Sequence, residues 1–428
     1  MFDQNGLSLD QAPPISVVFR FFLGGGLFGV VASFLILTFG TSIFDYTAKE
    51  ALILTHTLTL GVMLSFMFAA LFQMLPVIAG VTLTAPTTKA AWVQYPLSIG
   101  IITLLLAFYI QSNQTLFMVA SVLLGGTITT IAIMMLGKLL RLPNHSASSK
   151  GMSIALLGLI ALTLLALYLT GTLAGIVEGA YYTSVKQAHF SFGLFGWVAL
   201  LIISISFQVI EMFYVTPSYP TITSRYLPII LFVLLIAMAL LPTLSMATTL
   251  LIAFILMAYA LLTLRRLTQR KRPLADATVW LWRIGMGMLL LSMGAATIHQ
   301  FTHHTALLAV CAILFAGFAL SIVFSMFYKI VPFLTWFHLS AQGYFTAPMM
   351  HEVIHPKTAM KHLYIHTASF ILLLGAVALK PLIYIAGVAM LLSFGWMLWQ
   401  IIHAWKLYIH TQRTGEKFDL NTTPSHKE

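Results

Sequence analysis

Residues 56–80 read HTLTLGVMLSFMFAALFQMLPVIAG. Apart from His56 the stretch holds no ionisable side chain, and it is long enough to cross a bilayer, which takes roughly 20 apolar residues. Backbone amides in lipid must be satisfied within their own segment, so an open sheet is excluded. The stretch therefore predicts a transmembrane helix that carries an imidazole near one end.

The composition of the whole chain gives the same class. Of its 428 residues, 60% are hydrophobic and 8% are charged, and the mean hydropathy is +0.96. So few charges cannot cover the surface of a soluble protein of this length. The single cysteine, Cys311, excludes a disulfide framework and CxxC metal sites.

Similar apolar runs recur along the chain, with short links between them. We expect an all-α polytopic membrane protein with a single transmembrane domain over residues 1–410 and a polar cytoplasmic tail over 411–428. The N-terminus has no basic region ahead of its apolar run, so we do not expect a cleaved signal peptide. About twelve runs are long enough to span: 16–42, 52–80, 91–111, 115–137, 152–172, 187–214, 226–244, 247–264, 278–298, 304–334, 362–379 and 382–405.

Basic residues indicate the orientation. In this twelve-span arrangement most of the 22 Lys and Arg residues fall on the side that holds both termini, whereas the opposite side has only Lys49, Lys186 and Lys380. The positive-inside rule then predicts a bacterial inner-membrane protein with cytoplasmic N- and C-termini. The net charge of +11 reflects topology, the expected environment is the lipid bilayer, and nucleic acid is rejected as a partner.

A short phrase recurs at three helix ends. FQMLP at 72–76, FQVIE at 207–211 and YKIVP at 328–332 are separated by 135 and 121 residues, which is four helices each time. Apolar words of this kind also recur by chance, but these three fall at equivalent helix ends. The spacing predicts three pseudo-repeated four-helix units, about 16–137, 152–264 and 278–405, around a pseudo-threefold axis.

Histidines precede the first two phrases. His56 lies 16 residues before Phe72 and His189 lies 18 before Phe207. An ionisable group within a membrane is costly and indicates a functional site. A neutral imidazole is a good ligand for haem iron or copper, whereas the alternative is a hydrogen-bonded core histidine.

Glycines follow both histidines. Gly61 and Gly193 lie five and four residues after His56 and His189, and such small residues would leave room for a flat cofactor or for a neighbouring helix. In the third unit His303 and His304 lie further out, beside His299. These three residues are candidate metal ligands or a polar interfacial loop.

This pattern resembles the catalytic subunit (subunit I) of the haem-copper oxidase superfamily, near the NnrS-like membrane proteins. The resemblance covers nearly the whole chain and is carried by the topology and by HTLTLGVM, HFSFGLFGWV and FYKIVPFLTWFHL. It implies that His56 is an axial haem ligand and that His189 is a copper ligand. It also implies a respiratory-chain or electron-donor partner.

The chain departs from that superfamily at the copper site. The run 226–244 has no histidine pair, the pair His303 and His304 is adjacent and displaced outward, and no tyrosine follows His189 at the expected place. Oxygen reduction at a binuclear centre is therefore not expected, and no motif fixes an enzymatic activity.

Residues 351–355, HEVIH, match the zinc-protease pattern HExxH. Pro356 follows at once, and the motif falls in a predicted cytoplasmic loop, so a chance match is favoured over a membrane metalloprotease. Weak metal binding stays open for the histidines predicted toward the cytoplasmic side: His338, His351, His355, His362 and His366.

Three functions remain. The first is a haem-binding redox protein, related to nitric oxide or oxygen, on an oxidase-like scaffold without a complete copper site. The second is a cofactor-poor structural, assembly or copper-handling protein for a respiratory oxidase. The third is transport of a small solute, which internal repeats also accompany.

Overall fold

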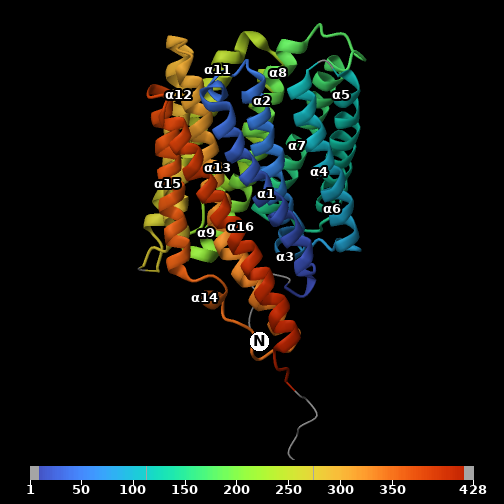
Figure 1. Ribbon diagram of the computed structural model, residues 1–428, viewed down its shortest axis with the longest axis vertical. Coiled ribbons are helices and arrows are strands. Elements are labelled where there is room, and N and C mark those ends of the chain that lie inside the picture. The colour runs from blue at the N-terminus through green and yellow to red at the C-terminus, as the bar shows by residue number, and fades with distance from the viewer. Residues whose placement is uncertain (1–8, 112, 273, 419–428) are drawn as a thin grey trace, which may run out of the picture.

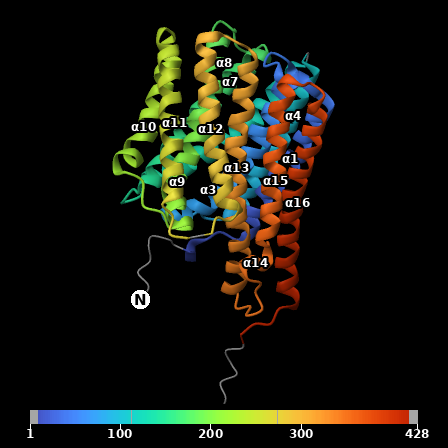
Figure 2. The same ribbon diagram turned by 90° about the vertical axis from the view of Figure 1, so that its left-hand side faces the viewer.

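The structure, a computed structural model, describes residues 9–111, 113–272 and 274–418. Helices make up 84% of the chain, and the described residues form no strand. Twelve helices are long and apolar enough to cross a membrane, which confirms the predicted all-α polytopic fold. They stand side by side as one bundle (Figures 1 and 2).

We number the candidate membrane spans 1 to 12 in chain order. Several consist of more than one helical piece, and three contain a π-helix. In order, the spans are α1 (Ile15–Phe39) with η2 (Gly40–Phe44); α2 (Lys49–His56), η3 (Thr57–Leu64) and α3 (Ser65–Ala79); α4 (Pro86–Ile110); α5 (Gln114–Ala120), η4 (Ser121–Gly125) and α6 (Gly126–Leu140); α7 (Ala147–Leu173); α8 (Tyr182–Ser191), η5 (Phe192–Ala199) and α9 (Leu200–Tyr214); α10 (Thr221–Leu240); α11 (Ser245–Thr268); α12 (Ala277–Thr302); α13 (Ala306–Ala341); α15 (Pro356–Ala378); and α16 (Leu382–Thr414).

Three short helices lie outside the spans: η1 (Leu9–Gln11), η6 (Pro242–Leu244) and α14 (Met350–Val353). One boundary differs from its prediction for a clear reason. The run 226–244 was expected to be helical throughout, yet α10 ends at Leu240. Leu241 leaves the helical conformation (φ −123°, ψ 78°) because a residue that precedes a proline is disfavoured in the α-helical region.

Spans 2, 6 and 10 form the centre of the bundle. The most apolar stretches of these spans are 83%, 72% and 56% buried, whereas those of the other spans are 44% buried or less. A segment buried this far touches protein on most sides. These spans carry the recurring phrase, which lies near the end of spans 2 and 6 but nine residues before the end of span 10. Phe72, Phe207 and Tyr328 are all buried.

Spans 2 and 6 are built from matching pieces. The π-helices η3 and η5 have eight residues each, and the following helices α3 and α9 have fifteen each. Thr57 and Phe192, where the π-helices begin, are 135 residues apart, as are Phe72 and Phe207. Span 10 is a single uninterrupted helix, α13, so this match covers two of the three predicted units.

The first span begins, and the last span ends, at the same end of the bundle, which also carries α14. Helices α2 and α8 lie at the opposite end (Figure 1). Below, the two ends are called the terminal end and the far end. The expected polar tail begins later than predicted, because α16 continues to Thr414. Residues 415–418 lie beside Tyr344, which forms an isolated bridge with Lys417. Residues 419–428 lie outside the described part of the chain.

Candidate functional site

His56 and His189 lie together at the far end of the bundle. Their ring centroids are 6.3 Å apart and the ring planes differ by 15°. Each is the eighth residue of its span, so both lie about 10 Å along the helix axis from its start. Two residues 133 positions apart in sequence thus form one pair at one depth.

A backbone carbonyl group fixes which nitrogen of each ring carries the proton. His56 Nδ1 lies 2.8 Å from the Leu52 carbonyl oxygen, and His189 Nδ1 lies 3.4 Å from that of Leu162. A carbonyl only accepts, so Nδ1 of a neutral ring carries the proton and Nε2 keeps its lone pair. Neither ring makes another hydrogen bond within the described residues. Each imidazole therefore offers one free nitrogen ligand.

The hydroxyl groups of Thr57 and Thr59 do not form hydrogen bonds with these rings. Thr57 donates to the Ile53 carbonyl and Thr59 to that of Thr55, both at 2.8 Å. The Phe108 ring lies 5.0 Å from the His56 ring and closes one side of the pair. His56 is hydrogen-bonded to a backbone carbonyl and not to Thr57 or Thr59, so the alternative of a hydrogen-bonded core histidine stays open beside that of a metal ligand.

Both histidines lie next to an interruption of the α-helix. η3 starts directly after His56, and η5 starts three residues after His189. A π-helix accommodates one extra residue per turn and is rare outside functional sites. It shifts the angular position of the side chains that follow it. In both span 2 and span 6, a π-helix therefore sets the direction of the histidine side chain relative to the side chains of the helix that follows, α3 or α9.

The glycines next to the pair are covered by protein. A Cβ on Gly61 would lie 2.6 Å from Phe28 Cγ, and one on Gly193 would lie 3.5 Å from a methyl group of Leu162. Gly61 therefore allows α1 to approach span 2 closely. Of the two partners expected for Gly61, a flat cofactor or a neighbouring helix, the structure shows the neighbouring helix, because Phe28 of α1 fills that space.

His299, His303 and His304 form a separate group at the far end of α12. His303 and His304 are exposed, and the His299 ring is bonded through Nδ1 to the His304 carbonyl oxygen at 3.1 Å. His303 ends α12 in the left-handed conformation (φ 52°). No three His, Cys, Asp or Glu side chains of the described residues are grouped to share a metal ion. These histidines thus do not complete the site at His56 and His189.

The oxidase resemblance implies that His56 is a haem ligand and that His189 is a copper ligand. The structure places His56 beside His189. His303 and His304 lie in the turn between α12 and α13, before the tenth span begins, and His299 lies in the last turn of α12.

The HExxH match has no helix to present it. His351 lies in the four-residue helix α14, Ile354 is extended (φ −137°, ψ 112°), and His355 caps the start of α15. Glu352 accepts a hydrogen bond from the Met349 backbone N–H at 2.7 Å, and His355 Nδ1 accepts one from the Lys357 N–H at 3.2 Å. Glu352 and His355 thus act as helix caps, on two different helices.

A second histidine pair lies deep between spans 10, 11 and 12. His362 and His366 are each 1% exposed, with ring centroids 6.2 Å apart. Both nitrogens of His362 are used: Nδ1 lies 2.8 Å from the Tyr328 hydroxyl and Nε2 lies 2.9 Å from Ser393 Oγ. His366 Nε2 lies 2.9 Å from Ser321 Oγ.

The sequence placed this inner pair toward the cytoplasmic side without recognising its burial. The signal was the spacing of one helical turn between His362 and His366, on a face that also carries Ser369 and Phe370. With three of the four ring nitrogens bonded to hydroxyl groups, the pair links three helices.

Comparison with known proteins adds no family. No protein-family model matches the chain, and no curated protein sequence matches it.

Proposed function

We propose that this protein is a metal-binding redox protein of the membrane and that His56 and His189 hold the metal centre, haem iron or copper. The observation that carries the proposal is the near-parallel ring pair at 6.3 Å with both Nε2 atoms free. Metal-bound histidines almost always donate their other N–H to a carbonyl or carboxylate, as both rings do here.

The separation suits one metal between two imidazoles. A first-row metal lies about 2.0 Å from its imidazole nitrogen, and that nitrogen lies about 1 Å from the ring centre, so the two centres are about 6 Å apart. The 6.3 Å separation of the His56 and His189 ring centres agrees with this sum. A direct hydrogen bond between two neutral rings that both carry their proton on Nδ1 is impossible, because Nε2 of each only accepts.

The ligand set decides the type of chemistry. If haem is bound, His56 and His189 would both hold its iron, and the chemistry that it would supply is electron transfer. The carbonyls of Leu52 and Leu162 orient the rings and make Nε2 a better donor to the metal. The Phe108 ring packs against the His56 ring at 5.0 Å and limits its movement on that side.

The location suits exchange of electrons with a partner on the far side of the membrane. The pair lies about 10 Å from the start of its spans, within reach of a redox protein docked at the far end. The uneven distribution of lysine and arginine supports a bacterial inner membrane with cytoplasmic termini, so the far end would face the periplasm. A respiratory-chain protein is then the expected electron donor.

Copper handling is the second candidate, and the covered glycine favours it. With Phe28 against Gly61, the space for a flat macrocycle on that side of span 2 is filled. Two imidazoles without a third ligand can hold a copper ion, and copper accepts imidazole nitrogen readily. In this form the protein would supply or store copper for an oxidase.

The test is an absorption spectrum and a metal analysis of the whole protein, purified from cells supplied with haem and copper. A Soret band that is lost in both His56→Ala and His189→Ala supports the haem protein. Copper without a Soret band, lost in the same two variants, supports copper handling. The matched control is His303→Ala with His304→Ala, which should change neither. A protein that contains neither haem nor copper contradicts both candidates.

A further inference from the structure

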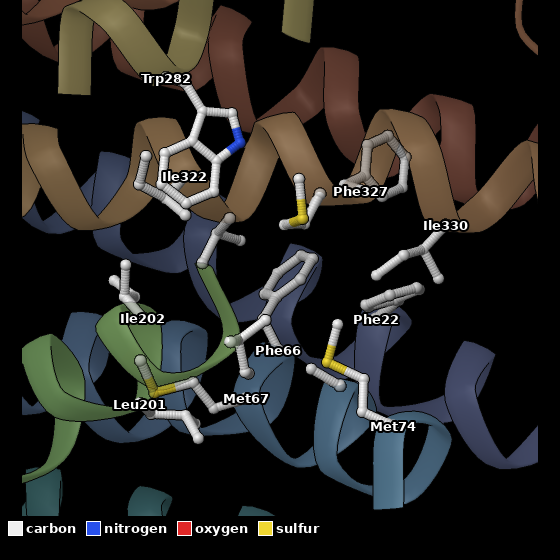
Figure 3. Close-up of a pocket in the computed structure, with 14 residues that line it drawn as sticks. Phe22, Phe66, Met67, Met74, Leu201, Ile202, Trp282, Ile322, Phe327 and Ile330 are labelled. Atoms are coloured by element: carbon white, nitrogen blue, oxygen red, sulfur yellow. The ribbon is translucent and has the colours of Figure 1, made fainter. Parts of the chain in front are cut away.

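A cavity of ≈ 60 Å³ lies in the half of the bundle nearer the terminal end, where spans 2, 6 and 10 meet α1 and α12. Figure 3 shows side chains from these elements pointing toward it, among them Phe66, Leu201, Trp282 and Ile322. It lies far from the histidine pair, because Met67 is eleven residues along span 2 from His56, roughly 15 Å along the axis.

The wall of the cavity offers almost nothing to water. Of all the side chains that line it, only Trp282 contains a nitrogen or an oxygen atom, and the rest are aliphatic, phenyl or thioether groups. A buried water needs two to four polar partners, and apolar cavities that lack them stay dry. A polar or charged ligand would lose its hydration without compensation. The cavity therefore selects an uncharged, apolar occupant.

The volume limits the size of that occupant. A water molecule needs roughly 10–15 Å³ of cavity volume, whereas a cavity of about 150 Å³ takes up benzene or xenon. At ≈ 60 Å³ the cavity admits one atom or a diatomic molecule, but a lipid chain is too large. Met67, Met74 and Met326 border it, and unbranched thioether side chains adjust to an occupant at little cost.

We propose that this cavity is a binding site for an apolar gas molecule of dioxygen size. An empty cavity forfeits dispersion contacts along the part of its wall that is closed by protein, and a gas molecule restores them. The surrounding bilayer dissolves apolar gases, and the three spans that form most of the wall are the central ones of the bundle. The inference does not rest on the metal centre, since no residue that lines the cavity is a proposed ligand.

Xenon is the probe, because it is apolar, similar in size and visible by anomalous diffraction. Crystals of the whole protein are pressurised with xenon, and the anomalous map is inspected between Phe66, Met67 and Ile322. We expect a peak there in the native protein and its complete loss in Ala70→Leu, whose added side chain enters the cavity. The control is Ala258→Leu, at an exposed position of α11, which should keep the peak.

Three results would overturn the proposal: no peak in native crystals, ordered water in the cavity, or a peak that persists in Ala70→Leu. If Ala70→Leu does not fold, Val323→Leu fills the cavity from span 10 and is read in the same way. Haem and copper are measured separately on the same preparation. Loss of the metal site therefore cannot be mistaken for loss of the gas site.

Discussion

Two histidine pairs in this protein have nearly the same ring separation but opposite surroundings. His56 and His189 come from two spans, are half-buried, and use only Nδ1. His362 and His366 lie one turn apart on one helix, are buried, and have three of their four nitrogens bonded to hydroxyls.

The difference shows what identifies a candidate ligand in a membrane protein. Burial alone does not, because in the deeper pair three of the four ring nitrogens are already bonded to hydroxyl groups. A metal held by two histidines needs a free nitrogen on each ring, and of the two pairs only the outer one has a free nitrogen on both rings. The inner pair instead supplies hydrogen bonds between helices, which are a main source of association in lipid. Substitution should therefore affect stability at one pair and metal content at the other.

The largest effect on stability is expected for His362→Leu. The change leaves the Tyr328 and Ser393 hydroxyls without their imidazole partner in a buried site, and we expect a loss of about 2–3 kcal/mol in the free energy of unfolding. Thermal unfolding of the detergent-solubilised protein measures it, with His403→Leu at an exposed position of α16 as the control. Unchanged stability would show that the inner pair does not link the helices.

Gly61→Ala tests the packing beside the outer pair. The added methyl group would lie 2.6–2.9 Å from Phe28 side-chain atoms, and such overpacking costs about 1–3 kcal/mol. Phe28→Leu should restore part of the loss in the double variant. Gly137→Ala is the control, since nothing lies within 4 Å of its new methyl group. A double variant no more stable than Gly61→Ala alone would mean that Phe28 is not what Gly61 accommodates.

His366→Leu should cost less than His362→Leu, about 1 kcal/mol, because only the Ser321 hydroxyl loses its partner. The Nδ1 atom of His366 is buried without a hydrogen bond, so its removal relieves a desolvation cost. The same unfolding measurement checks the ranking. A larger loss than for His362→Leu would reverse our assignment of which histidine holds the helices together.

The smallest effect concerns pH and the ion pair of Asp276 with Lys329, at 2.6 Å. Burial raises the pKa of Asp276. The hydrogen bonds from Lys329 and Thr278 and the positive charge of Lys329 lower it by more, so the net pKa of Asp276 lies below its ordinary value. A carboxyl group whose pKa falls on folding stabilises the protein above its unfolded pKa, and this stabilisation is lost as pH falls through the folded pKa.

Because the Asp276 side chain is 46% exposed, we expect less than about 1 kcal/mol from this pair. Unfolding midpoints measured from pH 6 to pH 3 should fall slightly more steeply for the native protein than for Asp276→Asn. Equal slopes would place the acid sensitivity elsewhere.

The sequence predicted the spans well because membrane helices depend on length and hydropathy alone. It missed the end of α10, where Pro242 acts on the preceding residue, and it missed the π-helices, which no local pattern marks. His56 and His189 could be identified as candidates one by one, since an imidazole in an apolar run is conspicuous. Their contact with each other could not be predicted, because it depends on how spans 2 and 6 pack.

The burial of the inner pair could not be predicted from the sequence either. His362 and His366 lie near the polar end of a predicted span, and hydropathy places them in the interface. Only the packing of α15 against α13 and α16 buries them beside Tyr328, Ser321 and Ser393.

The central claim is that His56 and His189 bind one metal centre together, and metal content measured against substitution tests it most directly. Haem and copper per chain are determined for the native protein, for His56→Ala, for His189→Ala and for His362→Leu, each verified as folded by its unfolding transition. We predict one metal centre per chain in the native protein, its loss in each outer variant alone, and its retention in His362→Leu. Retention of the metal in either outer variant, or its loss only with His362, would contradict a shared site at the far end of spans 2 and 6.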